Sequence, residues 1–240
     1  MININTILNM DCVSGMKTLP DNSIDLTLTS PPYDNELFRI TKEGGVVVWV
    51  VGDSTVRGSE SGTSFRQALY FKDIGFNLHD TMIFQKKNPI PQNHNRYEQC
   101  FEYMFVFSKG KPKTFNPIRV ETKNSGKAFD WGKRNKLDDG QCRRHREDSE
   151  VIICNKTKIH NNIFEYSIGG QVVGHPATFP EKLAQDHILS WSNEGDIVLD
   201  PFMGSGTTAK MALLNNRKYI GFEISKEYCE LANKRLSELS

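Results

Sequence analysis

One stretch of this chain, "VVVWVVGD", constrains the fold more strongly than any other. It starts at Val46 and is apolar at six successive positions, whereas a strand with one face in water alternates apolar and polar side chains. Strands buried on both faces are typical of parallel sheets covered by helices. We therefore expect a doubly wound α/β fold.

The rest of the chain alternates between strand-like and helix-like segments, as a parallel sheet with crossover helices requires. The other expected parallel strands are "TILNMD", "IDLTLTS", "IVLDPF" and "KYIGFEI", and the runs "LHDTMIFQK" and "FEYMFVFSK" are expected to pair as an antiparallel unit at one edge. Helices are expected at "ELFRITKEGG", ending at the glycines, and at "TSFRQALYFKDIGF", "PEKLAQDHILSW", "AKMALLNN" and "SKEYCELANKRLSEL". The apolar positions expected to face inward in the second and third of these helices are Phe65, Ala68, Leu69 and Ile74, and Leu183, Ala184, His187, Ile188 and Trp191.

Composition places the chain among ordinary globular proteins. Its 240 residues, 38% of them hydrophobic, are enough for one large domain with a sizeable core. No apolar run approaches the ~18 residues of a membrane span, and the first residues do not have the pattern of a signal peptide. Five scattered cysteines, an odd number, fit reduced thiols better than a disulfide framework. We expect a cytoplasmic protein.

Positive charge is concentrated in one part of the chain. Residues 109–158 contain 14 Lys and Arg against 7 Asp and Glu, although the net charge of the whole chain is only +1. This part also lacks long apolar periodicity, so we expect residues 110–167 to form an appended module that meets a polyanion. Residues 1–109 and 168–240 would form the two halves of the main domain.

A glycine-rich turn follows one expected strand, in "VLDPFMGSGTT". Asp200 ends the strand, and Gly204 and Gly206 lie in the turn before a helix, where backbone N–H groups can approach an anionic group closely. Glu223 ends the next strand, where a carboxylate can accept hydrogen bonds from ribose hydroxyls. No Lys follows the second glycine, so the turn is not a P-loop. The pattern predicts a nucleoside cofactor, and a dinucleotide stays an alternative on these residues alone.

A second motif, "TSPPY", ends the expected strand "IDLTLTS". Two successive prolines stop a strand and stiffen the chain that follows, because proline donates no backbone hydrogen bond. The end of this strand would therefore display the Ser30 hydroxyl and the Tyr33 ring in fixed positions.

Four segments together, "TSPPY", "HPATFPEKL", "DPFMGSGTT" and "YIGFEIS", resemble the motifs of the β-type amino-methylating DNA methyltransferases, which use S-adenosylmethionine. The order is that of the β-type group, with the catalytic motif first and the cofactor glycines near the C-terminus. The resemblance covers about three-quarters of the chain, everything outside the basic segment. It implies a circularly permuted, Rossmann-like methyltransferase sheet with an antiparallel edge pair, to which a basic target-recognition module is appended.

The resemblance also implies roles for individual residues. The Ser30 hydroxyl and the Pro31 carbonyl would accept hydrogen bonds from the target amino group, and Tyr33 would stack on a base turned out of the duplex. Glu223 would hold the ribose, and Asp11 with the Cys12 backbone would reach the adenine edge. The catalytic set is Ser30, Pro31, Pro32 and Tyr33; the cofactor set is Asp11, Cys12, His175, Pro176, Phe179, Asp200, Phe202, Gly204, Ser205, Gly206, Thr207 and Glu223. The methyl donor is already activated, so no metal is required.

The target base is argued from two positions. The adenine-N6 enzymes of the family more often carry Asp where Ser30 stands and Lys where Phe179 stands, so cytosine N4 is the expected target and adenine N6 the alternative. Methylation of cytosine at carbon is not expected, because no cysteine stands in a Pro-Cys context. Two further alternatives are a catalytically silent DNA-binding protein, which would have damaged motifs, and an RNA methyltransferase.

The basic segment would recognise the target, since lysines mostly meet phosphates and arginines can also read guanine edges. The residues expected to bind DNA are Lys127, Lys133, Arg134, Lys136, Arg143, Arg144 and Arg146. A zinc site made by Cys142, His145, Cys154 and His160 is a weaker interpretation, because their spacing is irregular. The expected partner is double-stranded DNA, and the protein itself would be a prokaryotic nucleoid-associated or phage-encoded one. A homodimer and a companion restriction endonuclease are left open.

Overall fold

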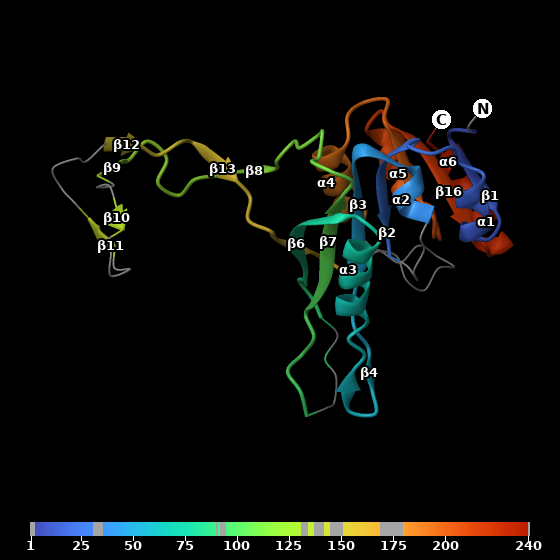
Figure 1. Ribbon diagram of the computed structural model, residues 1–240, viewed down its shortest axis with the longest axis horizontal. Coiled ribbons are helices and arrows are strands. Elements are labelled where there is room, and N and C mark those ends of the chain that lie inside the picture. Colours follow the sequence, from blue (N-terminus) through green and yellow to red (C-terminus); the bar gives the residue numbers. More distant parts are fainter. Residues whose placement is uncertain are drawn as a thin grey trace. The chain divides into compact units, whose positions relative to one another are not determined.

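The computed structural model describes residues 3–30, 36–89, 91, 95–130, 134–136, 142–144, 151–168 and 180–239. The chain forms two compact units, one made of Met1–Asn116 with Asn162–Ser240 and the other of Pro117–Asn161. The larger unit contains an eight-stranded sheet with helices on both faces (Figure 1). No helix in the described ranges has the length and apolar character to cross a membrane.

The sheet has the strand order β1-β16-β15-β2-β3-β7-β6-β14. Its strands are β1 (Thr6–Asn9), β2 (Ile24–Thr29), β3 (Thr41–Val51), β6 (Asn77–Lys86), β7 (Phe101–Ser108), β14 (Ile163–Tyr166), β15 (Ile197–Asp200) and β16 (Lys218–Glu223). Every neighbouring pair is parallel except the two pairs that involve β7. The predicted antiparallel pairing of β6 with β7 is therefore present, and β7 is the strand that runs opposite to the rest of this sheet.

The permuted order that the resemblance implies is confirmed. The first strand of the chain, β1, is an edge strand and pairs with β16, which pairs in turn with β15. The two ends of the chain therefore lie side by side in the sheet, as Figure 1 shows. The prediction that the β6–β7 pair lies at the edge of the sheet is wrong, because β14 pairs in parallel with β6 and is itself the edge strand.

In the described part of the chain, six helices cover the sheet. Helices α1 (Cys12–Lys17), α2 (Glu36–Ile40) and α3 (Thr63–Asp73) pack on one face, and α4 (Glu181–Trp191), α5 (Thr207–Leu214) and α6 (Lys226–Ser237) pack on the other. The expected helix at "ELFRITKEGG" is too long, since α2 ends at Ile40 and the chain already enters β3 at Thr41.

The core consists of two apolar clusters, one under each helix layer, and β3 contributes to both. Val46, Val48 and Val50 belong to the α4–α6 cluster, and Val47, Trp49 and Val51 to the α1–α3 cluster. The uninterrupted apolar run is therefore explained by burial on both faces. The predicted inward face of α4 is confirmed, with His187 and the four apolar residues of that face all buried.

The prediction for α3 is partly wrong. Ala68 is buried, but Phe65 and Leu69 are 53% and 61% exposed, and Phe71 takes the core position instead. Phe71 stacks on Phe107 of β7 with ring centroids 4.4 Å apart. The apolar stripe of the sequence is wider than the buried stripe of the helix, so helical spacing alone could not choose between these residues.

The smaller unit consists of short antiparallel ribbons. β8 (Arg119–Glu121) pairs with β13 (Thr157–Ile159), β9 (Ala128–Asp130) with β12 (Val151–Ile153), and β10 (Arg134–Lys136) with β11 (Cys142–Arg144). Its boundaries, 117–161, are narrower than the expected 110–167. The difference at the C-terminal side arises because β14 pairs with β6 and so belongs to the main sheet.

Candidate active site

Four neighbouring strands end in the residues that the sequence singles out. β1, β16, β15 and β2 are parallel and adjacent, and their last residues are Asn9, Glu223, Asp200 and Thr29. Asn9 lies opposite Glu223 in the register. The carboxyl ends of parallel strands meet at one edge of a sheet, which is where ligands bind in open α/β folds.

Asp200 joins the glycine-rich turn to β2, the strand that ends at the predicted catalytic motif. Its side chain is only 2% exposed and accepts hydrogen bonds from the Thr29 hydroxyl at 2.8 Å and the Thr208 hydroxyl at 2.7 Å. The backbone N–H of Phe202 donates a third bond to the same carboxylate at 3.0 Å. Burial raises the pKa of Asp200 to about 6, and these hydrogen bonds oppose the rise.

The turn after β15 requires its glycines. Gly204 and Gly206 have φ angles of +52° and +81°, which favour glycine. At Gly206 a Cβ atom would also stand 2.9 Å from the Cβ of Ala232 in α6, so the turn could not accept a side chain without moving that helix. Ser205 and Thr207, on either side of Gly206, are buried. The backbone of the turn is thus held close to the strand ends.

Glu223 is positioned by two backbone N–H groups. The N–H of Gly204 donates to one oxygen at 2.8 Å and the N–H of Ser225 donates to the other, also at 2.8 Å. Each carboxylate oxygen can accept more than one hydrogen bond, so both retain acceptor capacity. The carboxylate is therefore fixed in place and still able to bind hydroxyl groups, as the ribose role requires.

Asp11 and Cys12 lie just beyond the end of β1, which pairs with β16, the strand that ends at Glu223. Asp11 caps α1, where its carboxylate accepts a hydrogen bond from the Ser14 N–H at 3.0 Å, and this bond lowers the pKa of Asp11. Cys12 is the first residue of the helix. The Asn9 side chain fastens β1 to β16 by donating to the carbonyls of Glu223 and Ile224.

Ser30 is exposed and directly follows Thr29 at the end of β2. The bond from Thr29 to Asp200 therefore fixes the start of the catalytic motif relative to the glycine-rich turn. Other predicted site residues lie outside the described part of the chain: Pro31, Pro32, Tyr33, His175, Pro176, Phe179, Lys133 and Arg146.

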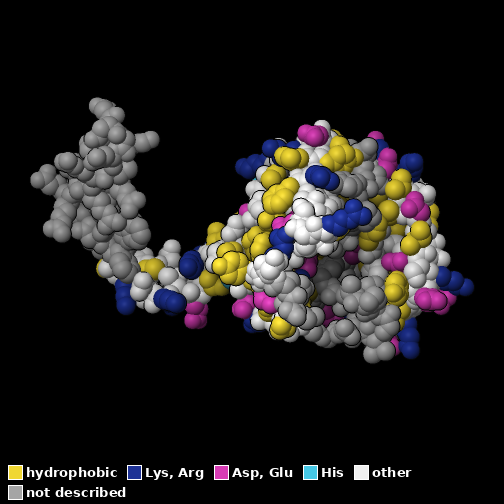
Figure 2. Space-filling view, turned by 90° about the horizontal axis from the view of Figure 1, so that it is seen from below, with side chains coloured by type: hydrophobic (Ala, Val, Ile, Leu, Met, Phe, Trp, Pro, Cys, Tyr) yellow, Lys and Arg dark blue, Asp and Glu magenta, His cyan; other side chains and the backbone are white. Residues whose placement is uncertain are grey.

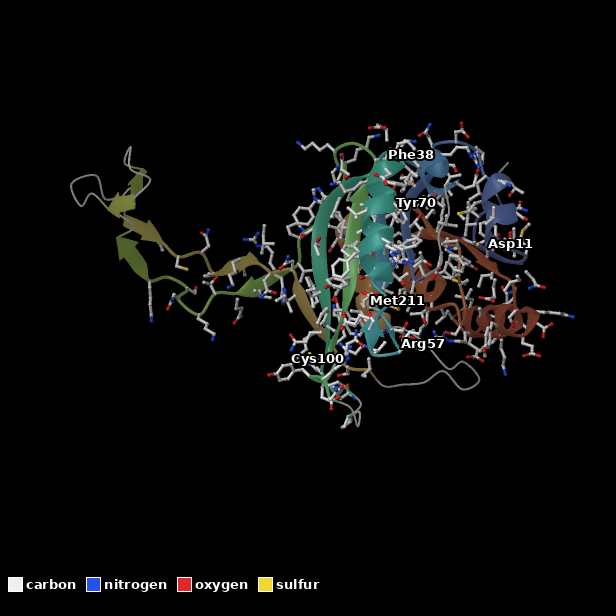
Figure 3. The ribbon with its side chains drawn as sticks, turned by 60° about the horizontal axis from the view of Figure 1, so that its bottom comes forward. Asp11, Phe38, Arg57, Tyr70, Cys100 and Met211 are labelled. Carbon is white, nitrogen blue, oxygen red and sulfur yellow. The ribbon has the colours of Figure 1, made fainter. Side chains whose placement is uncertain are left out.

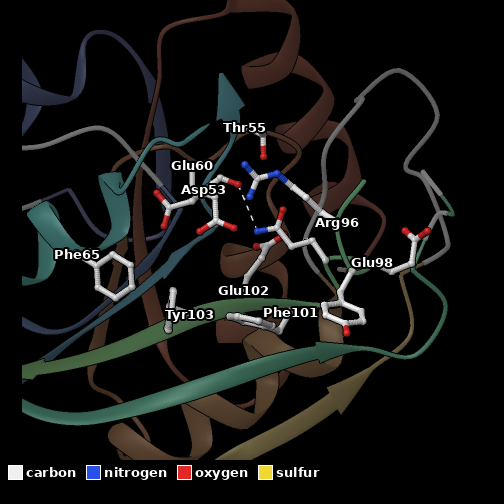
Figure 4. Close-up of a pocket in the computed structure, with 12 residues that line it drawn as sticks. Asp53, Thr55, Glu60, Phe65, Arg96, Glu98, Phe101, Glu102 and Tyr103 are labelled. Carbon is white, nitrogen blue, oxygen red and sulfur yellow. Dashed lines mark hydrogen bonds between the residues drawn. The ribbon is translucent and has the colours of Figure 1, made fainter. Parts of the chain in front are cut away.

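A cavity of about 390 Å³ opens at the same edge, between the end of β3 and the start of β7 (Figure 4). The rings of Phe65, Phe101 and Tyr103 line one side, and carboxylates of Asp53 and Glu102 lie across from them. Glu102 is paired with Lys86 at 2.7 Å. Figure 2, seen from below, shows that this side of the larger unit is hollowed. Rings beside hydrogen-bonding groups can stack on and contact a planar base.

The predicted DNA-binding residues that the structure describes lie in the smaller unit. Lys127 is exposed, and β10 and β11 pair so that Arg134 lies opposite Arg144 and Asn135 opposite Arg143. Lys136 lies opposite Cys142 in the same ribbon. The backbone thus brings four of the seven predicted basic residues onto one two-stranded ribbon. Among the described residues no group of three or more potential metal ligands forms.

Sequence reasoning missed three residues that hold the site together: Thr29, Thr208 and Asn9. Thr29 and Thr208 lie within the motifs "TSPPY" and "DPFMGSGTT" but were given no role, and Asn9 stands two residues before Asp11. The feature that could have indicated a role in the site is their position at strand or helix ends on the ligand edge. The partners of two of them are far away in sequence, 171 residues for Thr29 and Asp200 and 214 for Asn9 and Glu223, whereas Thr208 is eight residues from Asp200.

Comparison with known proteins gives the family. The family model described as DNA methylase matches residues 35–234. The chain belongs to this DNA methylase family. It is 56% identical, over 92% of its length and 91% of the relative's, to the orphan methyltransferase M.BamHII of Bacillus amyloliquefaciens. It is 29% identical to the type II methyltransferase M.BglII of Bacillus subtilis, over 98% of this chain and 69% of that one.

Two solved structures share the fold of this chain. The crystal structure of the M1.HpyAVI-SAM complex matches with a TM-score of 0.67 and 25% identity, covering 96% of this chain and 98% of that one. The PvuII DNA methyltransferase, which is cytosine-N4-specific, matches with a TM-score of 0.69 and 21% identity, covering 95% and 85%. The α/β methyltransferase fold that the motifs imply is therefore confirmed.

Proposed function

We propose that this member of the DNA methylase family transfers a methyl group from S-adenosylmethionine to the N4 amino group of cytosine in duplex DNA. The observation that carries the proposal is the position of Ser30. It is exposed at the carboxyl end of β2, directly after Thr29, whose hydroxyl is bonded to Asp200 in the turn that would hold the cofactor. A serine at this position of the motif favours cytosine over adenine.

The residues at the strand ends fit S-adenosylmethionine. Glu223 keeps free acceptor capacity for the two ribose hydroxyls, and Gly204 and Gly206, which have no side chains, let the backbone of the turn approach a ligand closely. Asp11 and Cys12 follow the adjacent strand, where the adenine edge would lie. When bound, the cofactor supplies a sulfonium methyl group that needs no further activation.

The protein's task is to make the base nitrogen nucleophilic and to aim it. The lone pair of an amino group on a nucleobase is delocalised into the ring, so acceptors on the amino protons favour a pyramidal nitrogen. The Ser30 hydroxyl and the Pro31 carbonyl would be these acceptors. In-line placement contributes most of the remaining acceleration, since effective molarity is worth roughly 7 to 11 kcal/mol in favourable cases. Asp200 acts through Thr29 and is a positioning residue.

The identity of the methylated base tests the proposal. Plasmid DNA from a host without DNA methylation is incubated with the protein and S-adenosylmethionine, digested to nucleosides and separated by mass spectrometry. We expect 4-methylcytosine. The appearance of 6-methyladenine would support the alternative within the family and contradict the assignment to cytosine, and a reaction without the cofactor gives the background.

Replacement of Glu223 by glutamine is expected to weaken S-adenosylmethionine binding about tenfold or more. The substitution replaces an acceptor oxygen by an NH2 group that faces the donor N–H of Gly204 or of Ser225, and hydrogen bonds to charged groups are worth roughly 1.5 to 3 kcal/mol. Isothermal titration calorimetry measures the affinity. Glu230→Gln, an exposed carboxylate change on α6, is the matched control. Equal affinities of the Glu223 variant and the wild type would contradict the ribose role.

A further inference from the structure

A small β-hairpin extends from the ligand edge of the sheet. It follows β3 directly and consists of β4 (Thr55–Val56) and β5 (Ser59–Glu60), with Val56 opposite Ser59. All six residues from Thr55 to Glu60 are exposed. An isolated two-stranded hairpin is marginally stable in water. A hairpin without a buried face therefore needs support from elsewhere in the protein.

The base of the hairpin is fastened at several points. The Asp53 carboxylate accepts hydrogen bonds from the Ser61 hydroxyl at 2.7 Å, from the Ser64 N–H at 3.2 Å and from the Ser64 hydroxyl. These bonds hold the pKa of Asp53 below its ordinary value. The N–H of Ser61 also donates to the Ser54 carbonyl at 2.8 Å. The two ends of the hairpin are thus held together where they leave the body of the protein.

The tip of the hairpin is braced by the segment that joins β6 to β7. The Arg96 guanidinium donates to the Gly58 carbonyl at the turn, and the Gln99 side chain donates to the Asp53 carbonyl at 3.3 Å (Figure 4). The hairpin is therefore fixed in direction, although its own side chains are in solvent.

The residue at the tip is an arginine in an unfavourable backbone conformation. Arg57 and Gly58 have φ angles of +50° and +78°, as a two-residue type I′ turn requires. Asn, Asp or Gly is usual at the first of these positions, because other residues disfavour a positive φ. In the part of the chain that the structure describes, the Arg57 guanidinium forms no hydrogen bond or ion pair. An outlier of this kind indicates a function for the side chain.

The register places the hairpin next to the catalytic strand. Trp49 of β3 lies opposite Thr29 of β2, and neighbouring strands are ~4.8 Å apart. Arg57 is eight residues beyond Trp49, so at ~3.3 Å per residue the tip reaches up to about 26 Å past the level of Thr29. Figures 1 and 3 show the hairpin and Arg57 projecting from this edge. The hairpin therefore stands beside the edge that a duplex would approach to bring a base to Ser30.

We propose that the β4–β5 hairpin is a second DNA-contacting element, separate from the smaller unit, and that Arg57 binds a backbone phosphate of the duplex whose base is presented to Ser30, at a distance from that base. The inference rests on the proposed function insofar as DNA must approach this edge. An exposed guanidinium without a partner is suited to a phosphate, with which it forms two hydrogen bonds. Of the nearby acidic groups, Asp53 is occupied by Ser61 and Ser64, and Glu102 is paired with Lys86. Glu60 lies on the hairpin itself, and in the described part of the chain it forms no ion pair with Arg57.

The experiment compares Arg57→Ala with Lys72→Ala, which removes one exposed charge from the far end of α3. Fluorescence anisotropy measures Kd between 50 and 300 mM salt for a duplex with the site found in the plasmid assay and for a scrambled duplex. We expect Arg57→Ala to raise Kd about fivefold on both duplexes and to reduce the salt slope by about 0.9, the value for one phosphate contact. Arg57→Lys should keep most of the affinity.

Several outcomes would overturn the proposal. Arg57→Ala could bind like the Lys72 variant, or it could lose affinity for the specific duplex alone, which would indicate a base contact instead. Thermal melting of each variant checks the fold. Binding to the scrambled duplex does not depend on methyl transfer, so a failed hairpin contact and a failed assignment of the reaction give different results.

Discussion

Replacement of Ser30 by alanine is expected to lower the rate of methyl transfer by about 100-fold or more. The hydroxyl would accept a hydrogen bond from the target amino group as its nitrogen becomes nucleophilic, and removal of one positioned hydrogen-bonding group from an active site typically costs roughly 10²- to 10³-fold. Ser30 is exposed at the end of β2, so removal of its hydroxyl leaves no buried group unsatisfied. Folding and cofactor binding should therefore be unchanged.

Single-turnover transfer of labelled methyl groups to plasmid DNA measures the Ser30 effect. The loss should appear in the rate at saturating DNA, with little change in the affinity for DNA or S-adenosylmethionine. Ser30→Thr keeps a hydroxyl and should recover part of the rate, and Ser237→Ala removes an exposed serine hydroxyl from the end of α6 as a control. Transfer by Ser30→Ala at the wild-type rate would refute the proposed mechanism.

The parts of the fold that the sequence predicts well are those set by local pattern. The apolar run from Val46 to Val51 predicts burial on both faces, and the periodicity of α4 predicts its inward side. The motif order predicts that β1 pairs with β16, a contact between residues more than 200 positions apart. Here the family resemblance supplied what periodicity could not.

The parts that escaped prediction depend on distant partners. β14 has only four residues and no distinctive pattern, so its place at the edge of the sheet follows from pairing with β6. In the site this holds for Thr29, whose bond to Asp200 joins residues 171 positions apart, whereas the other two donors to this carboxylate, Thr208 and the backbone N–H of Phe202, are close to it in sequence. A single chain shows which residues are polar, but it does not show which of them meet.

Replacement of Asp200 by alanine is expected to lower the free energy of unfolding by about 3 kcal/mol or more. The change leaves the Thr29 and Thr208 hydroxyls and the Phe202 N–H without their acceptor inside the protein, and an unsatisfied buried donor costs roughly 1 to 3 kcal/mol. Thr29→Val removes one of these bonds and should cost about 1 kcal/mol. Urea unfolding measures both values, with Thr18→Val, whose hydroxyl bonds within α1, as a control.

The double variant Thr29→Val, Asp200→Ala distinguishes loss of the Thr29–Asp200 hydrogen bond from unrelated losses of stability. If the bond couples the two residues, the combined loss should be smaller than the sum of the single losses by about 1 kcal/mol, because the bond can be removed only once. The same variants should lose methyl transfer through displacement of Ser30, with a larger effect on kcat than on the affinity for S-adenosylmethionine. Additive losses would show that Thr29 and Asp200 act independently and would remove Asp200 from its positioning role.

The penalty for Asp200→Ala should also depend on pH in a defined direction. The native pKa of Asp200, about 6, lies above the ~3.9 of an unfolded aspartate, so the native state binds this proton more tightly. The stability linked to this group is therefore present at acid pH and is lost as the pH rises from about 4 through 6. We expect the penalty to be about 1 kcal/mol larger at pH 5 than at pH 7.5. A penalty that grows with pH would mean that hydrogen bonding to the carboxylate outweighs the cost of burying its charge.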